Sequence, residues 1–265
     1  MTLSGLELWQ HTRPDLLDGC LFWEDCALCE GTGRWPTQPD YPCPNCLEMV
    51  SRPFQETGGL HGWPRFALAD LAGFHWSALP DPVGRTLKAF ANRLDDHLDA
   101  GHNLLLTGGV GSGKTHLAVG VGVLAMGLGY TAYATVFADL LLELRASWQP
   151  GSRLNEAHIL EMLADVDLLI LDDLGVERDT PWASERLAHL VNLRYAQQRS
   201  ILVTSNLTPA QLEQRLDPRV FSRLMDGGLM VELVGVGDFR RMRGPEQSAH
   251  SSQLAQVPVS STRGP

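Results

Sequence analysis

Eight residues near the middle of the chain carry the pattern of a phosphate-binding loop. Glycines let the backbone turn tightly enough for several N–H groups to point toward the phosphates of a nucleotide. A lysine adds positive charge, and the hydroxyl after it is placed to ligate the Mg²⁺ that accompanies a triphosphate. With the histidine that follows, the predicted ATP-binding residues are Gly108, Gly109, Val110, Gly111, Ser112, Gly113, Lys114, Thr115 and His116.

The segments on either side of this loop support the prediction. The apolar run 103–107 precedes it, and an apolar pattern with helical spacing follows it. A glycine-rich turn before a helix is the alternative, but it does not account for the complete GxxxxGKT string between a strand and a helix.

A second acidic motif ends the apolar run 168–171, which is typical of a buried parallel strand. Asp172 is predicted to hold Mg²⁺ through water, and Asp173 to orient the attacking water. The alternative is a pair of carboxylates that simply end a strand in solvent. Aspartate reaches less far than glutamate, so we expect slow hydrolysis, with ATP binding more important than turnover.

A third strand is predicted at 200–205, and Asn206 follows it. Its amide could bond the attacking water or the γ-phosphate, although Ser-Asn at a strand end is also ordinary turn chemistry. The order of phosphate loop, acidic strand and polar-ended strand favours the first interpretation.

Four of the five cysteines form two Cys-x2-Cys pairs with thirteen residues between them. This spacing suits tetrahedral zinc, and a cytosolic location disfavours the alternative, a set of disulfides. The metal would supply much of the folding free energy of so small a ribbon. The predicted zinc ligands are Cys26, Cys29, Cys43 and Cys46. Cys20 fits neither pair, and we expect it to be a buried free thiol.

Composition limits the remaining possibilities. A chain of 265 residues, 44% of them hydrophobic, can hold one α/β core with a small accessory module. The formal net charge of −10 argues against a uniformly basic nucleic-acid surface, so any such contact must be local. The first residues show neither a basic leader nor an apolar core, and glycines interrupt the apolar region 117–144. We therefore expect a cytoplasmic protein that does not enter a membrane.

Strands alternate with helices along the second half of the chain. Helices are predicted at 82–100, 137–148, 154–164 and 181–197, with a shorter one from Pro209, and strands at 131–135 and 229–234. This order predicts a parallel sheet with helices on both faces and nucleotide at the carboxyl ends of the strands. We expect a zinc-ribbon-like module at 1–52, a linker at 53–65, an ATPase domain at 66–243 and a disordered tail at 244–265.

The ordered motifs between 66 and 243 resemble those of the DnaC/DnaI-type replicative helicase loaders and the related IstB-type transposition ATPases, which are AAA+ proteins. The segments that carry the resemblance are 103–118, 167–175, 192–195, 203–206 and 219–224. The resemblance implies an AAA+ core and an ATP-dependent loader that binds the replicative DNA helicase and helps place it on single-stranded DNA. It further implies that the zinc module, which IstB-type proteins generally lack, docks the helicase. A transposition helper ATPase acting on DNA is the alternative.

The resemblance also assigns roles to single residues. Asn206 is similar to the sensor that contacts the γ-phosphate, and Arg223 to the arginine finger that reaches a nucleotide on the next subunit, which implies self-association. Arg219, one helical turn earlier, is a rival for that role. Arg240 resembles the second sensor arginine. A solvated surface charge is the alternative for each arginine.

In the same family, the helices after the second core strand contact single-stranded DNA, which corresponds to 137–153 here. Aromatic and cationic side chains in this stretch suit base stacking and phosphate contact. We therefore expect contacts from Phe137, Arg145 and Arg153, with Trp148 nearby, although Phe137 could equally be a core residue.

Two other classes of protein remain open from the sequence. A small-molecule kinase also needs a phosphate loop, but its cysteines would lie inside the kinase core. A nucleotide-gated adaptor with negligible turnover would use the same loop without rapid hydrolysis.

Overall fold

The computed structural model describes residues 34–35, 38–42, 66, 69, 71, 74–149, 155–235 and 237–239, the first two ranges by backbone alone. Several predictions lie outside these residues. They concern the four zinc ligands Cys26, Cys29, Cys43 and Cys46, the cationic residues Arg153 and Arg240, the linker 53–65 and the tail 244–265.

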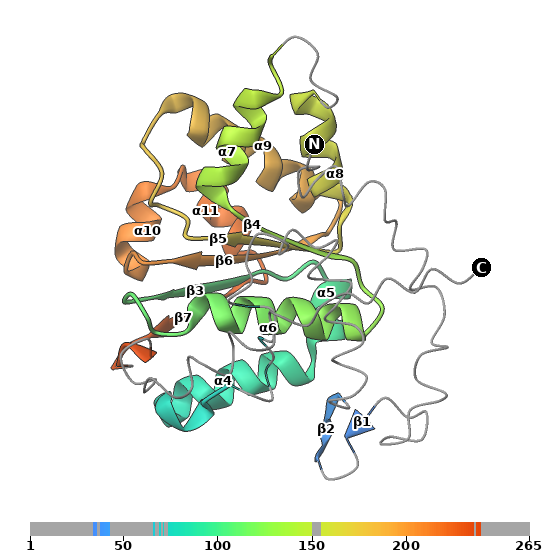
Figure 1. Cartoon of the computed structure of the whole chain (residues 1–265), viewed down its shortest axis with the longest axis vertical. Helices are drawn as coiled ribbons and strands as arrows, with labels where there is room; N and C mark the ends of the chain where they lie inside the picture. Colours follow the sequence, from blue (N-terminus) through green and yellow to red (C-terminus); the bar gives the residue numbers. More distant parts are fainter. Residues whose placement is uncertain are drawn as a thin grey trace, which may run out of the picture.

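A parallel sheet of five strands forms the centre of the described core (Figure 1). Its spatial order is β4-β5-β6-β3-β7. The strands are β3 (Leu104–Gly108), β4 (Ala132–Val136), β5 (Leu168–Asp172), β6 (Ser200–Ser205) and β7 (Leu229–Leu233). The chain passes from β3 over two strands to β4 and returns through β5 and β6, so β5, β6 and β3 are neighbours.

Helices cover both faces of this sheet (Figure 1). On one face lie α4 (Asp81–Asn92), α5 (Leu94–Asp99) and α6 (Lys114–Gly127). On the other lie α7 (Phe137–Ala146), α8 (Glu156–Asp165), α9 (Pro181–Ala196), α10 (Pro209–Arg215) and α11 (Pro218–Met225). A short 3₁₀ helix, η4 (Trp76–Ala78), precedes α4. The predicted parallel α/β fold is confirmed.

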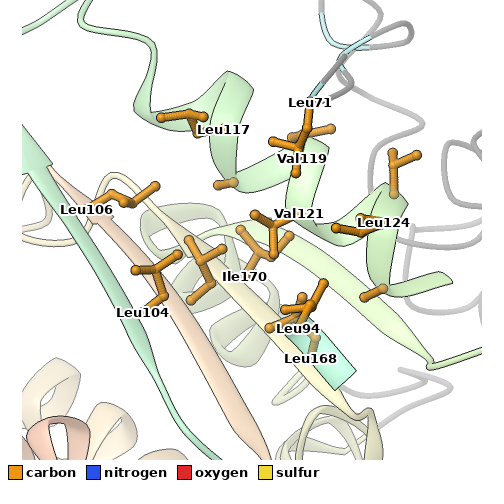
Figure 2. Packing of buried hydrophobic residues seen from close by; sticks show 14 of the residues in the cluster. Leu71, Leu94, Leu104, Leu106, Leu117, Val119, Val121, Leu124, Leu168 and Ile170 are labelled. Atoms are coloured by element: carbon orange, nitrogen blue, oxygen red, sulfur yellow. The ribbon is translucent and has the colours of Figure 1, made fainter. Parts of the chain in front are cut away.

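Alternation along each strand divides the core into two apolar clusters. Leu104, Leu106 and Ile170 face α4, α5 and α6 and pack against Leu117 and Val121 of α6 (Figure 2). The intervening residues face the other way and join the side chains of α7 to α11, as Leu105, Leu169 and Val203 show. Both faces of the strands are therefore buried, which accounts for their continuously apolar sequence.

Two helix starts follow the Thr-Pro signal in the sequence. Thr180 accepts a hydrogen bond from the backbone N–H of Ala183, and proline occupies the first turn of α9. Thr208 forms a complete capping box with Gln211 at the start of α10.

The single helix predicted at 82–100 is wrong, because the structure breaks it at Arg93. That residue has φ −125° and ψ 31°, and separates α4 from α5. The apolar spacing continues across the break, from Leu87 and Phe90 to Leu94 and Leu98, so periodicity gives no sign of it. Each segment nevertheless buries its own apolar residues.

A two-stranded antiparallel pair, β1 (Arg34–Trp35) and β2 (Gln38–Pro42), lies in the interval between the two cysteine pairs. Within the residues described, no helix is both long and apolar enough to cross a membrane.

One fully buried arginine forms hydrogen bonds to α8, to the segment before β5 and to β6, at the amino end of the sheet. Arg194 of α9 is 0% exposed, and its guanidinium donates to the carbonyls of Leu163, Val166 and Ser200 at 2.5, 2.9 and 2.6 Å. Further bonds reach Ala164 and Asp167. Burial lowers the pKa of Arg194 to about 9, so it remains charged at neutral pH. The cation sits at the carboxyl end of α8, where the helix dipole favours positive charge.

We predict that Arg194→Met destabilises the protein by about 3 kcal/mol or more, because several buried carbonyls lose their donor at once. The measurement is urea unfolding followed by circular dichroism. Arg199→Met is the matched control, since Arg199 forms an ion pair with Asp167 from a side chain that is 40% exposed. We expect that change to cost about 1 kcal/mol or less. Equal losses in the two variants would contradict this account.

Candidate nucleotide-binding site

The predicted phosphate loop connects β3 to α6, with Lys114 as the first residue of the helix. Gly113 has φ +92°, and a Cβ there would lie 3.1 Å from the Phe74 ring. Gly111 has φ +78°, and a Cβ there would overlap the carboxylate of Asp238. Both positions therefore require glycine for conformation and for space. Ser112 is buried, while Val110 at the tip of the loop is 63% exposed.

The ammonium of Lys114 lies inside the loop and forms a hydrogen bond to the residue that follows β6. It donates to the carbonyl oxygens of Gly108 and Gly109 at 2.9 and 2.8 Å, and to Oδ1 of Asn206 at 2.9 Å. The lysine is only 5% exposed. Its charge is thus held at the carboxyl end of β3, in reach of the groups that end β6.

Two oxygen atoms that suit Mg²⁺ lie together beside the loop. Thr115 Oγ1 donates to Oδ1 of Asp172 at 3.0 Å and to Oδ2 at 3.2 Å. Octahedral Mg²⁺ binds oxygen at about 2.1 Å, so adjacent ligands lie roughly 3 Å apart. This separation suits two neighbouring ligand positions of a magnesium ion, whereas the sequence analysis expected Asp172 to hold the ion through water.

Thr204 positions the two aspartates, a role that the sequence did not reveal. Its hydroxyl donates to Asp172 Oδ1 at 2.5 Å and accepts from the backbone N–H of Asp173 at 3.0 Å. Thr204 is 0% exposed and lies on β6, the neighbour of β5. Its place two residues before Asn206 is the only signal, because a threonine inside a strand is otherwise an ordinary β-former.

The carboxyl group of Asp172 is buried, with 4% of the residue exposed. Burial first, and then the charge of Asp173, raises the pKa of Asp172, while bonds from Thr204 and Thr115 and the charge of Lys114 oppose the shift. A cation bound at this carboxylate would stabilise its ionised form.

Asn206 connects the phosphate loop to the acidic pair. Its Oδ1 accepts from Lys114, and its Nδ2 donates to Asp173 Oδ1 at 3.1 Å. The backbone of Asp173 has φ +54°, in the left-handed region. Because Asn206 bonds to both residues, a displacement of Lys114 would be transmitted through Asn206 to Asp173.

Aromatic rings lie along the flank of the loop. The rings of Phe74 and His116 are 5.6 Å apart, and those of Phe74 and Phe239 are 6.2 Å apart. The backbone N–H of Phe239 donates to the carbonyl of Gly111 at 3.1 Å. The segment after β7 thus contacts the phosphate loop directly.

Arg223 lies away from this group, near the start of β3. Asn103, the residue before that strand, donates from Nδ2 to the carbonyls of Arg223 and Leu224 at 3.3 and 3.2 Å. Arg219 is exposed in the first turn of the same helix, α11. The structure therefore brings together the loop, Asp172, Asp173 and Asn206, and separates Arg223 from them.

The expectation that Phe137 contacts DNA is wrong for this structure. Its side chain is 1% exposed and packs in the apolar cluster beneath α7, so its ring cannot stack on a base. Arg145 is exposed and lies over the ring of Trp182, with its guanidinium carbon 4.5 Å from the ring centre. Trp148 is 56% exposed and meets Trp182 edge to face at 5.5 Å.

Comparison with known proteins agrees with this architecture. The family profile described as IstB-like ATP binding protein matches residues 65–230, more than half of the chain. The chain belongs to this family. The family match and the parallel core together identify this IstB-like protein as an AAA+ ATPase.

Relatives of the IstB-like chain fall into several groups. The uncharacterized protein YdaV of Escherichia coli (strain K12) is 33% identical over 143 residues, 53% of this chain and 57% of that protein. The replicative helicase loader DnaC of Buchnera aphidicola subsp. Schizaphis graminum is 26% identical over 145 residues, 55% of this chain and 58% of that protein. The insertion sequence IS1162 putative ATP-binding protein of Pseudomonas fluorescens is 41% identical over 106 residues, 40% of this chain and 44% of that protein.

One solved structure extends the comparison. The crystal structure of the DnaC helicase loader superposes with a TM-score of 0.55 and 25% identity, and covers 64% of this chain and 98% of that chain. By contrast, this chain spans less than two thirds of the curated relatives it matches. The family and the ATPase core are therefore established, whereas the activity of any whole relative is a proposal for this chain.

We predict that Thr204→Val lowers the ATPase rate by about 10- to 100-fold and raises the Mg²⁺ concentration needed for half-maximal rate, because Asp172 loses its positioning bond. Steady-state hydrolysis in a magnesium titration measures both. Thr107→Val is the matched control, because Thr107 is equally buried on β3 and its hydroxyl has no hydrogen-bond partner among the described residues. An unchanged magnesium requirement in Thr204→Val would contradict the proposed role.

Proposed function

We propose that this protein is an ATP-dependent loader that binds the replicative DNA helicase and helps place it on single-stranded DNA. The observation that carries the proposal is the match to the DnaC helicase loader structure, of which this chain covers 98%. Relatives named as replicative helicase loaders support it from the sequence side.

The site residues take the following roles in this proposal. The loop from Gly108 to His116 binds the triphosphate of ATP, with Lys114 as the counter-charge. Thr115 and Asp172 hold Mg²⁺, and Asp173 orients the attacking water. Asn206 responds to the γ-phosphate, because it already joins Lys114 to Asp173. When bound, Mg²⁺ supplies charge neutralisation at the phosphate oxygens.

Arg223 acts on the nucleotide of a neighbouring copy in the same proposal. It lies near the amino end of β3, whereas the phosphate loop follows the carboxyl end of that strand. Self-association would then complete each ATP site with an arginine from outside. Arg219 remains the rival on α11, and Arg240 is proposed as a second arginine that contacts the nucleotide.

The N-terminal residues supply the helicase contact in this proposal. Cys26, Cys29, Cys43 and Cys46 would hold a structural zinc ion in a docking module over 1–52, followed by the linker 53–65 and the ATPase domain 66–243. The pattern of two Cys-x2-Cys pairs supports it.

Single-stranded DNA would contact the face formed by Arg145 and Trp148, and Arg153, which lies outside the described residues, would add a further cation. The cation and the half-exposed ring suit phosphate contact and base stacking. Phe137 has no part in this proposal because it is buried.

A transposition helper ATPase acting on DNA is the second proposal. The match to the IstB-like family and to insertion sequence ATP-binding proteins favours it. A nucleotide-gated adaptor with negligible turnover is a third and weaker proposal. Only the side chain of Asp173, which is shorter than a glutamate, favours it.

We predict that the full-length protein co-purifies with the replicative helicase of its host in Mg²⁺ and ATP. The double variant Cys43→Ser, Cys46→Ser should lose the complex, because the docking module would not fold without zinc. The readout is a pull-down with purified proteins, together with the zinc content of each preparation.

The ATPase rate of the double variant serves as the control, since the described core does not include these cysteines. A complex that survives the cysteine changes would remove the zinc module from the proposal. Absence of a complex with the wild type, with or without ATP, would favour the transposition ATPase.

We predict that Arg145→Ala weakens binding of a labelled single-stranded oligonucleotide and lowers the slope of log K against log salt by about 0.7, the loss of one phosphate contact. Fluorescence anisotropy over a salt series measures both quantities. Lys88→Ala is the matched control, because Lys88 also lies over a tryptophan ring, that of Trp76, on the opposite face of the sheet. An equal effect of the two changes would argue against this DNA-binding face.

A further inference from the structure

The side chain of Arg223 has a partner on the neighbouring helix. Its guanidinium carbon lies 5.7 Å from the centre of the Tyr195 ring, which comes from the last turn of α9. The hydroxyl of Tyr195 donates to Oδ2 of Asp226 at 2.7 Å, and Asp226 is the residue that ends α11. Tyr195 therefore contacts the arginine with its ring and the end of the arginine's own helix with its hydroxyl.

The backbone beneath Arg223 is fixed independently of that tyrosine. Asn103 is 6% exposed, and its Nδ2 donates to the carbonyls of Arg223 and Leu224. The Oδ1 of the same amide accepts from the backbone N–H of Ile201 at 2.7 Å, which ties α11 to β6. The side chain of Arg223 makes a long hydrogen bond from Nη1 to the carbonyl of Arg219, at 3.5 Å, and its guanidinium lies over the ring of Tyr195.

Asp226 is a competitor for the arginine in this arrangement. A carboxylate at the end of α11 could pair with Arg223 and neutralise its charge. Among the ion pairs of the described residues none joins the two, and Tyr195 occupies Oδ2 of the carboxylate. The hydrogen bond to Asp226 raises the pKa of Tyr195, so the hydroxyl continues to donate at neutral pH.

The position of Arg223 determines which bound nucleotide its guanidinium can contact. Asn103 precedes β3, and the phosphate loop follows that strand of five residues, which spans roughly 16 Å. This distance exceeds the reach of an arginine side chain. Arg223 can therefore act only on a nucleotide held by another copy of the chain.

We propose that Tyr195 is a positioning residue that orients Arg223 toward the nucleotide bound by a neighbouring copy. The proposal rests on the role of Arg223 under the proposed function. The ring restricts the conformations that the arginine samples, so less entropy is lost when the guanidinium meets the transition state. The bond to Asp226 holds the ring in place and engages the competing carboxylate.

Steady-state ATPase assays of the full-length protein, with single-stranded DNA present, test this. Tyr195→Ala should lower kcat roughly 10- to 100-fold, a loss typical of a misplaced group, with little change in KM. Tyr195→Phe keeps the ring but loses the bond to Asp226, so it should recover part of that loss. Tyr130→Ala is the matched control with unchanged kcat, because Tyr130 forms the same type of bond, to Asp99 at 2.8 Å, away from Arg223.

A mixing experiment separates orientation from a folding defect. Lys114→Ala keeps an ordered Arg223 but has an impaired nucleotide site, whereas Tyr195→Ala has the reverse. Mixing the two impaired proteins should restore activity, because one copy supplies the arginine and the other the nucleotide. Failure of the mixture to recover activity would overturn the proposal.

The variant Arg223→Ala distinguishes the role of Tyr195 from the role of Arg223. A large loss of kcat in Arg223→Ala together with wild-type activity in Tyr195→Ala would overturn the role of Tyr195 and leave that of Arg223 intact. Full activity in Arg223→Ala would overturn the role of that arginine under the proposed function, and the inference with it. Loss in both variants, with recovery in Tyr195→Phe and on mixing, supports the inference.

Discussion

The carboxyl ends of β5, β6 and β3 lie side by side, and the hydrogen bonds of the nucleotide site depend on that adjacency. Lys114 follows β3, Asn206 follows β6 and Asp172 ends β5, so three segments distant in sequence contribute to one network. The strand order is what makes this possible, because β6 enters the sheet between β3 and β5. A sheet with its strands in sequence order would separate β3 from β6 and place Lys114 too far from Asn206 for a direct bond.

The same network brings opposite charges into a buried place. Lys114 and Asp172 are each nearly inaccessible to water, which disfavours their charged forms unless they are bonded. The lysine is bonded to loop carbonyls and to Asn206, and the aspartate to the hydroxyls of Thr115 and Thr204. Neutral dipoles thus help to stabilise each charge, and the charge of Lys114 also lowers the pKa of Asp172.

Local signals in the sequence predicted much of this arrangement. The glycines and Lys114 have a fixed spacing along the chain, and Thr180 and Thr208 mark their helices with a proline directly after each cap. Features that arise between distant segments were harder to predict. Thr204 acts through the neighbouring strand, Phe137 turns into the core because of the packing of α7, and Arg194 bonds to carbonyls of three other segments. The break at Arg93 was missed because both halves of the helix share one apolar pattern.

The amino and carboxyl ends of the strands form two edges of the sheet, and these have different functions if Arg223 acts on the nucleotide of a second copy of the chain. The carboxyl edge carries the groups suited to nucleotide, and the amino edge carries Arg223 with Asn103 and Tyr195 around it. Because β3 holds these groups at a fixed separation, one copy must place its amino edge against the carboxyl edge of the next. Such a contact joins two different surfaces, so it repeats head to tail and generates a ring or a helical filament rather than a closed pair of two copies. Hydrolysis at each site would then depend on a neighbour, and the geometry of the assembly would control the rate.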